Sequence, residues 1–577
     1  MTPPERTLAY HQRTKHHLRR YARSLGRLDW ATQPDPFRTF AGAETVELPL
    51  LADGLEVLYS DLERPGVVAP RPLAFDAMAI FFELSLGLSA WKRHEDARWA
   101  LRCNPSSGNL HPTEGYAVVP DVPGLSAGVY HYVSRDHALE RRCAPDGDGA
   151  RALAARLSPA FLVGLTSIHW REAWKYGERA FRYCQHDAGH AIAALRYAAA
   201  AIGWSATMVD GLGDADIAAL LGLDRADDFA DVDPADREHP DAVLVVCPDG
   251  TDGRAAASAL SRAAPEILGA VRAGRWSGRA NALSTSHVPW EVIDDVAEAT
   301  QKPTTPPSDV VALSPQHSLP PLSSGGVDRG MRAATLIRQR RSALDYDGAT
   351  SIDAAVFYSM LDRLLPRPGV PPWDALPWEP LVHAGIFVHR VRGLEPGLYL
   401  FERSDAAHER LRAAMQPAFL WQKPAGCPDH LRFHLLMDAD LREVSRIVSC
   451  HQAIASDGVF SLGMIADFAE PVRERGAFWY RRLFWEAGVL GHVLYLEAEA
   501  MNRPDAPLRA TGIGCYFDDV FHDLFELSGD VFQSLYHFTV GGHVEDTRIT
   551  TLPPYAHLGE RGIDPVGAAQ SGLQPKS

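Results

Sequence analysis

The sequence predicts a protein of mixed helices and strands, built from two tandem halves. Three observations lead to this prediction. Short apolar strands alternate with helical stretches, a Pro- and Ser-rich segment at 301–330 divides the chain nearly in half, and the same glycine and aromatic pattern occurs on both sides of it. With 577 residues, the chain is long enough for two to four domains with substantial cores.

The composition is typical of a soluble globular protein, with 46% hydrophobic and 23% charged residues. A net charge of -16 argues against a general nucleic-acid binder. No apolar run approaches the roughly 18 residues of a membrane span, and the basic N-terminus lacks the apolar core of a secretory signal. The seven cysteines are scattered without a CxxC pair, as expected of reduced thiols in a cytosol. We therefore expect a cytoplasmic protein that binds neither nucleic acid nor membrane.

The elements of the first half can be placed in order from their patterns. A basic helical segment within residues 1–45 ends at Pro34 and Pro36, and apolar residues at helical spacing follow at 75–91. Strands are expected at 116–119, 128–133, 205–209 and 242–247, because these runs are short, apolar and rich in branched or aromatic residues. Ala-rich helices are expected at 150–163 and 178–202.

The second half repeats several of these features in the same order. Gly115–Val119 and Gly128–Tyr130 correspond to Gly385–Val388 and Gly397–Tyr399. Asp187-Ala188-Gly189 corresponds to Glu486-Ala487-Gly488, and Gly211-Leu212-Gly213 to Gly512-Ile513-Gly514. Matching order, spacing and residue type indicate a duplication.

The most informative stretch is Pro105–Asn109, which reads PSSGN and precedes a strand. Hydroxyl and amide groups on a tight turn suit a flat polar ligand with many acceptors, and the glycine at 108 lets the backbone come close. The alternative is an ordinary Ser/Asn/Gly turn. The second half has no counterpart, since Pro371–Trp378 stands in its place.

Two further groups carry possible chemistry. Arg340, Arg341 and Ser342 follow the linker on a helix expected to start near Met331, and they form a candidate anion grip; the alternative is a solvated basic face. Lys175 and Tyr176 approach the Ala-rich helix and present an ammonium and a phenol that could act as general acid or base. The alternative is a snorkelling lysine beside an interfacial tyrosine.

Two patterns are interpreted as decoys. His186 and His190 have zinc-ligand spacing, but Asp187 replaces the zincin glutamate and no third ligand is evident, so we expect no metal. Gly211-Leu212-Gly213 lacks the third glycine of a dinucleotide fingerprint and leads into aspartates.

Together these motifs resemble the nitroreductase superfamily, and within it the SagB/ThcOx-type dehydrogenases. NPSSGNLHPTEGY is similar to that group's flavin loop, as TKHH (14–17) and LDWATQPDPF (28–37) are to its N-terminal signature. The Lys175-Tyr176 pair resembles that of azoline oxidases. IRQRRSALDY (337–346) is similar to the first-helix motif that grips flavin phosphate, although Leu344 stands where a basic residue is usual.

The resemblance implies an α+β fold in which each half is a mostly antiparallel sheet flanked by helices, and the two halves form a dimer fused within one chain. The implied units are a nitroreductase-like domain at 1–300, a linker at 301–330, a degenerate nitroreductase-like domain at 331–556 and a flexible tail at 557–577. The implied cofactor is FMN, bound by Pro105, Ser106, Ser107, Gly108, Asn109, Arg340, Arg341, Ser342, Gly512 and Gly514. Because only the first half has PSSGN, we expect one FMN per chain.

The resemblance also implies an activity. We expect the dehydrogenation of a thiazoline or oxazoline in a peptide or natural-product intermediate, with Lys175 or Tyr176 taking the proton and a cyclodehydratase-type partner supplying the substrate. Alternatives are an NAD(P)H-dependent nitro or quinone reductase and a non-catalytic subunit of a biosynthetic complex.

Overall fold

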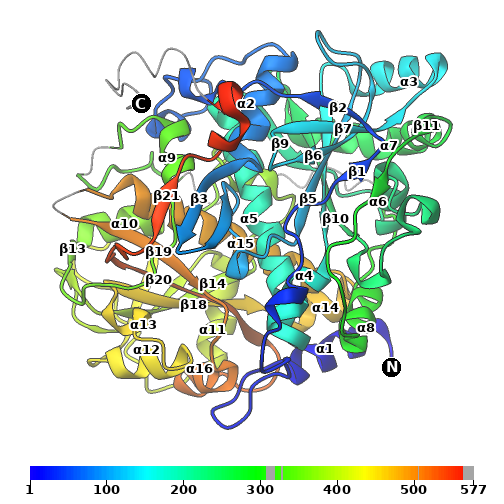
Figure 1. The fold of residues 1–577 in the computed structure, drawn as a ribbon. Coiled ribbons are helices and arrows are strands. Elements are labelled where there is room, and N and C mark those ends of the chain that lie inside the picture. The colour runs from blue at the N-terminus through cyan, green and yellow to red at the C-terminus, as the bar shows by residue number, and fades with distance from the viewer. Residues whose placement is uncertain (307–318, 327–328, 504–505, 563–577) are drawn as a thin grey trace.

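The computed structural model of the chain describes residues 1–306, 319–326, 329–503 and 506–562 (Figure 1). Its two largest sheets are antiparallel and share one strand order. The first runs β7 (Ala138–Ala144), β6 (Gly128–Val133), β5 (Thr113–Val119), β8 (Phe161–Ser167), β10 (His239–Cys247) and β9 (Ser205–Met208), with β2 (Glu44–Glu47) and β11 (Arg275–Trp276) beside β7. The second runs β17 (Arg432–Asp438), β16 (Gly397–Glu402), β14 (Val382–Val388), β18 (Phe460–Asp467), β20 (Phe532–Gly542) and β19 (Leu508–Ile513). The predicted α+β fold with mostly antiparallel sheets is confirmed.

Two central helices of 22 residues each, α5 (Ala180–Ala201) and α15 (Trp479–Ala500), lie side by side between the halves (Figure 1). The other first-half helices are α1 (Pro3–Arg13), α2 (Phe75–Ser85), α3 (Gly147–Leu157), α4 (His169–Tyr176), α6 (Asp214–Leu221), α7 (Gly253–Arg272) and α8 (Glu291–Ala299). Those of the second half are α9 (Ala333–Gln339), α10 (Ala354–Asp362), α11 (His408–Ala414), α12 (Arg442–Val448), α13 (Ile454–Asp457), α14 (Ala469–Glu474) and α16 (Asp518–Phe525). Short strands complete the fold: β1 (Phe40–Ala41) with β12 (Arg279–Ala280), β13 (Ile352–Asp353) with β15 (Val391–Arg392), and β21 (Thr550–Leu552) with β3 (Leu88–His94) and β4 (Ala97–Arg102).

The two central helices cross where glycine removes the side chain from each. A Cβ on Gly488 would lie 2.3 Å from the His186 carbonyl oxygen, and one on Gly189 would lie 2.3 Å from that of Trp485. Both values are far inside van der Waals contact, so the close approach requires glycine at both positions. The crossing lies in one hydrophobic core that contains residues of both halves, including Ile192 and Leu494.

Replacing Gly488 with alanine should therefore destabilise the protein by about 1–3 kcal/mol, the usual cost of forcing an extra carbon into a packed core. Urea denaturation of the variant measures this loss. Gly269 to alanine is the matched control, because a Cβ at that helical glycine meets nothing within 4 Å. Equal stability of the Gly488 and Gly269 variants would contradict the proposed role of the crossing.

Both ends of the chain cross to the opposite half. Near the N-terminus, the Lys15 ammonium pairs with Asp519 at 2.8 Å and the His16 amide donates to Asp518 at 3.0 Å. Near the C-terminus, β21 joins the first-half hairpin of β3 and β4, where the red and blue strands lie together (Figure 1). The halves are thus joined by exchanged segments as well as by their core.

The strand registers correct two details of the predicted repeat. Gly164 in β8 faces Tyr116, whereas the matching Gly463 in β18 faces Gly385, so Gly385 corresponds to Tyr116 and not to Gly115. Packing explains why the two glycines lie one residue apart when the strands are aligned. A Cβ on Gly115 would meet Leu86 at 2.3 Å, and one on Gly385 would meet Phe525 at 2.4 Å, so each glycine admits a different neighbour.

The second detail concerns the later glycine pair. Cross-strand pairing places Ala206 of β9 and Ala510 of β19 at equivalent positions, beside Val246 and Val540. Gly512 therefore corresponds to Met208, because both lie two residues further on. Gly211 and Gly213 instead follow β9 and pack against Ser261 and the Thr304 amide.

Three predicted helices end earlier than expected. The helical stretch predicted at 75–91 ends at Ser85, and β3 begins at Leu88. The helix predicted at 150–163 ends at Leu157, and β8 begins at Phe161. Helix α9 ends at Gln339, because Arg340 adopts φ -51° and ψ 130° and leaves the helix. Arg340, Arg341 and Ser342 therefore follow the helix and do not lie on it.

The predicted linker and tail are described only in part. Residues 307–318, 327–328 and 563–577 lie outside the described residues. At the start of the linker, Lys302 donates through its amide to Asp214 at 3.1 Å and through its ammonium to the Leu212 carbonyl at 3.0 Å. The domain boundaries themselves stay a prediction.

Candidate active site

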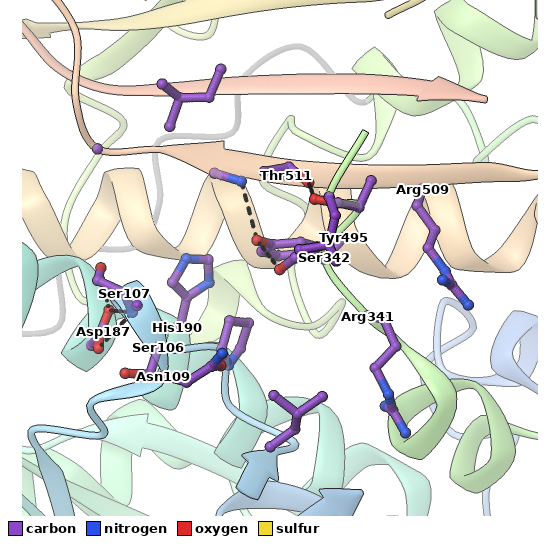
Figure 2. Close-up of a pocket in the computed structure, with 18 of the residues that line it drawn as sticks. Ser106, Ser107, Asn109, Asp187, His190, Arg341, Ser342, Tyr495, Arg509 and Thr511 are labelled. Atoms are coloured by element: carbon purple, nitrogen blue, oxygen red, sulfur yellow. Dashed lines mark hydrogen bonds between the residues drawn. The ribbon is translucent and has the colours of Figure 1, made fainter. Parts of the chain in front are cut away.

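A cavity of about 600 Å³ lies between the two halves. Ten residues predicted to bind the cofactor all line it, namely Pro105, Ser106, Ser107, Gly108, Asn109, Arg340, Arg341, Ser342, Gly512 and Gly514. Its two ends differ chemically. Arg341 and Arg509 lie at one end, and Ser106, Ser107 and Asn109 lie with Asp187 at the other (Figure 2).

The loop at the polar end is a short 3-10 turn at Ser107–Asn109, held by local hydrogen bonds. The His111 amide donates to the Ser106 hydroxyl at 2.8 Å. Gly108 has φ 60°, Asn109 φ 57° and His111 φ 52°, so two non-glycine residues adopt the left-handed conformation. Such residues cost about 1–3 kcal/mol each and persist only where surrounding contacts fix them.

Asp187 on α5 fixes the loop from behind. Its buried carboxylate accepts hydrogen bonds from the Ser107 amide at 3.0 Å and from the Ser107 hydroxyl at 3.0 Å. Burial raises the pKa of Asp187 to about 7, although the hydrogen bonds from the two serines oppose this. A carboxyl group with such a pKa can gain or lose a proton near neutral pH.

This raised pKa predicts a pH-dependent stability. The folded protein holds the Asp187 proton more tightly than the unfolded chain does. The resulting stabilisation is complete below the unfolded pKa of 3.8 and is lost as pH rises through about 7. Between pH 4 and pH 8, the wild type should lose about 4 kcal/mol relative to Asp187→Asn, because each pKa unit corresponds to about 1.4 kcal/mol. Urea denaturation of both proteins at several pH values measures the difference. A difference that stays constant with pH would disprove this titration.

Arg340 and Arg341 come from the second half and contact the first. The buried Arg340 guanidinium donates to the Arg102 carbonyl at 3.0 Å, just before the loop, and Arg341 donates to the Ser89 carbonyl at 2.9 Å. In the described parts of the chain, neither guanidinium forms an ion pair with a carboxylate. Burial and the adjacent Arg340 charge lower the pKa of Arg341 to about 10. Two neighbouring cations without a carboxylate partner form a ready anion site.

Ser342, which follows Arg341, is held by hydrogen bonding within the cavity. Its hydroxyl shares a hydrogen bond of 2.8 Å with the Tyr495 hydroxyl, which also accepts from the Gly512 amide at 3.1 Å (Figure 2). Ser342 pairs with Ala510 in an isolated bridge beside β19. Gly512 needs to be small, because a Cβ there would meet the Tyr536 hydroxyl at 2.1 Å.

Tyr176 lines the cavity near the loop, and Lys175 lies beside it. A Cβ on Gly108 would lie 2.6 Å from the Tyr176 hydroxyl and 3.0 Å from the Lys175 ammonium. Only glycine therefore leaves room for this pair. Burial, with the nearby Glu172, raises the pKa of Tyr176 well above its usual value, so its phenol stays protonated and is suited to donate a hydrogen bond or proton.

The decoy histidines on α5 have protein partners. His186 Nε2 contacts the Leu535 carbonyl at 3.0 Å, and His190 Nε2 contacts the Tyr536 hydroxyl at 3.3 Å. No group of three His, Cys, Asp or Glu side chains suited to a metal ion occurs among the residues that the structure describes. A search of the same residues finds no helix with the length and hydropathy needed to span a bilayer.

Several lining residues were missed from the sequence. They include Asp187, His190, Tyr495, Arg509 and Tyr536. Asp187 was noted as a repeat marker and as the residue in place of the zincin glutamate, and its burial in an Ala-rich helix gave no sign of its contact with the loop. The sequence contained one signal of its place in the site: Asp187 lies four residues after Tyr183 on this fully buried helix.

Comparison with known proteins agrees with this fold. Residues 94–230 match the Nitroreductase family. A nitroreductase-like protein of known structure from Anabaena variabilis superposes with a TM-score of 0.64 at 20% identity, covering 93% of this chain and 99% of its own. This similarity extends the fold to both halves.

Two curated relatives match a shorter region. The nitroreductase-like protein MJ1384 of Methanocaldococcus jannaschii is 30% identical over 125 residues, which is 21% of this chain and 63% of that protein. The trifolitoxin-processing protein TfxB of Rhizobium leguminosarum bv. trifolii is 33% identical over 130 residues, which is 21% of this chain and 35% of that protein. The chain thus spans less than two thirds of the length of each.

Proposed function

We propose that the chain is an FMN-dependent oxidoreductase that dehydrogenates a thiazoline or oxazoline ring in a peptide or natural-product intermediate. One observation carries the proposal: a polar loop from the first half and three arginines from the second line one cavity, with Arg341 and Arg509 at the end opposite the loop (Figure 2). Cavities of about 300–1,000 Å³ with few placed polar groups are typical of cofactor sites.

The residues present fit FMN. Arg340 and Arg341 provide two cations for a phosphate, and the buried Arg340 Nε has no hydrogen-bond partner within the described chain. Ser106, Ser107 and Asn109 provide donors and acceptors for a flat polar ring. When bound, the flavin supplies a two-electron acceptor.

The chain's own groups have separate tasks in this proposal. The Arg340 and Arg341 guanidinium groups bind and orient the phosphate, and Asp187 holds the Ser107 amide in place. The protonated Tyr176 phenol orients the substrate ring by donating a hydrogen bond. The Lys175 side chain, which lies against Gly108, relays the proton that leaves the substrate carbon.

We expect one flavin per chain, because other side chains stand in the place of the polar loop in the second half. Glu486, the counterpart of Asp187, accepts from the Leu381 amide at 3.1 Å and from the Trp378 indole at 3.3 Å. Arg482 occupies on α15 the place of Tyr183 on α5 and lies over the Trp378 ring at 5.1 Å. Indole and guanidinium groups thus stand where a polar loop would be needed.

The substrate class depends on the resemblance of Lys175-Tyr176 to azoline oxidases and on the similarity to TfxB, which is named for processing trifolitoxin. Both favour an intermediate made by another enzyme, so a cyclodehydratase-type partner belongs to the proposal. The second candidate is an NAD(P)H-dependent nitro or quinone reductase, which the match to the Nitroreductase family favours.

Flavin quantitation and anaerobic mixing test the proposal. The purified protein, reconstituted with FMN, should show a flavin spectrum and one FMN per chain. Thiazoline-containing peptides should bleach that spectrum, while NAD(P)H should not. Bleaching by NAD(P)H alone would support the reductase, and a protein that cannot be reconstituted with FMN would contradict both candidates.

A further inference from the structure

Two cysteines far apart in the sequence meet at the wall of the cavity. Cys450, just after α12, and Cys515, just after β19, are 65 residues apart, yet their Sγ atoms lie 2.6 Å from each other. Both are partly exposed and line the cavity. The other five cysteines, at 103, 143, 184, 247 and 427, are buried. This pair is therefore distinguished by both geometry and access.

The backbone around the pair is fixed by strain and by a shared hydrogen bond. Cys450 has φ 55° and His451 has φ 61°, so two successive non-glycine residues adopt the left-handed conformation. The side-chain amide of Gln452 donates to the Cys515 carbonyl at 3.1 Å and to the Ser449 carbonyl at 2.8 Å. One side chain thus ties the two cysteine loops together. Strained backbone held by such contacts is concentrated at functional sites.

The two thiols differ in acidity. The hydrogen bond with Cys450, together with nearby His16 and Arg179, lowers the pKa of Cys515 to about 5. The same hydrogen bond raises the pKa of Cys450. Cys515 is thus the nucleophilic thiolate and Cys450 the thiol that follows it, as in a nucleophile and resolving pair.

We propose that Cys450 and Cys515 form a thiol–disulfide exchange centre that reduces small-molecule disulfides entering the cavity. A disulfide bond is about 2.05 Å long, so the two sulfurs need only a small closing movement. The cavity favours a small substrate because the pair lies on its wall. This activity needs no flavin, and its test does not depend on the function proposed above.

The exchange balances within the protein and one substrate. The Cys515 thiolate attacks one sulfur of the disulfide R–S–S–R, forms a mixed disulfide and releases RS⁻. Cys450 gives its proton to that RS⁻ and attacks the Cys515 sulfur, which releases the second RS⁻. Two cysteines are oxidised to one disulfide, and one small disulfide is reduced to two thiols; solvent protonates the second.

Mass spectrometry of the full chain tests this centre. Reduced protein incubated with bis(2-hydroxyethyl) disulfide should lose two hydrogens, and its digest should contain the Cys450 and Cys515 peptides joined by a disulfide. Cys450→Ser should stop at the mixed disulfide on Cys515. Cys427→Ser, which removes a buried cysteine of the same half, should form the linked peptides as the wild type does.

Alkylation adds a readout that mere proximity would not change. At pH 6, iodoacetamide should modify Cys515 about fivefold to tenfold faster than free cysteine, because its larger thiolate fraction outweighs the lower intrinsic nucleophilicity. Modification of Cys515 at the rate of free cysteine would overturn the proposal. So would a wild-type protein that forms no linked peptides, or a Cys450→Ser variant that forms no mixed disulfide.

Discussion

Replacing Arg340 and Arg341 together with methionine should weaken FMN binding by about 10²- to 10⁴-fold. Each hydrogen bond to a charged group contributes about 1.5–3 kcal/mol, and the double variant removes two such donors from the phosphate end. Methionine keeps most of the buried volume, so the cavity wall should hold its shape. Titration of the cofactor-free protein with FMN, followed by flavin fluorescence, measures the loss.

The two arginines can be separated experimentally. Arg340 also donates to the Arg102 carbonyl, so its loss disturbs the backbone that leads into the loop. Arg341 contacts the Ser89 carbonyl and is only partly buried, so Arg341→Met reports on the phosphate more directly. Arg332→Met is the matched control, because that guanidinium pairs with Glu56 at the surface. Binding within threefold of wild type in the double variant would rule out the predicted grip.

The sequence predicted the members of this site better than their contacts. Pro105–Asn109 and Arg341 could be named because local chemistry marks them: a turn rich in hydroxyl groups and adjacent cations. Their meeting in one cavity depends on the crossing of α5 and α15, which brings together residues more than two hundred positions apart. No local sequence pattern indicates that residues so far apart in the chain will meet.

The same limit explains what was missed. Asp187 binds the loop across 80 residues, and Cys450 reaches Cys515 across 65. Neither contact leaves a spacing that can be recognised in the chain. The repeat was recognised, but matching Gly115 to Gly385 aligned the two halves one residue out of register. The two glycines are not equivalent, because each makes room for a different neighbouring side chain. A glycine in a strand indicates that a neighbour comes close, but not on which face of the strand that neighbour lies.

The catalytic proposal depends most on Lys175 and Tyr176. The double variant Lys175→Met and Tyr176→Phe should retain FMN while turnover falls by about 10²- to 10⁴-fold, the usual contribution of positioned acid–base groups. FMN should stay because Arg341 and Arg509 lie at the end of the cavity opposite the loop (Figure 2). Phenylalanine keeps the ring contact with Tyr183, whose centroid is 4.4 Å away. The loss would thus report the hydroxyl and ammonium groups.

A neighbouring hydroxyl provides the control for this experiment. The Tyr183 phenol donates to the Gly514 carbonyl at 3.0 Å, so Tyr183→Phe removes a hydroxyl from the same wall whose partner is backbone. Its turnover should stay within tenfold of wild type, since a neutral hydrogen bond contributes about 1 kcal/mol. Equal losses in the two variants would mean that the wall needs its shape and not its acid–base groups. Unchanged turnover in the double variant would remove Lys175 and Tyr176 from the mechanism, while the arginine titration would still decide whether the cavity binds FMN.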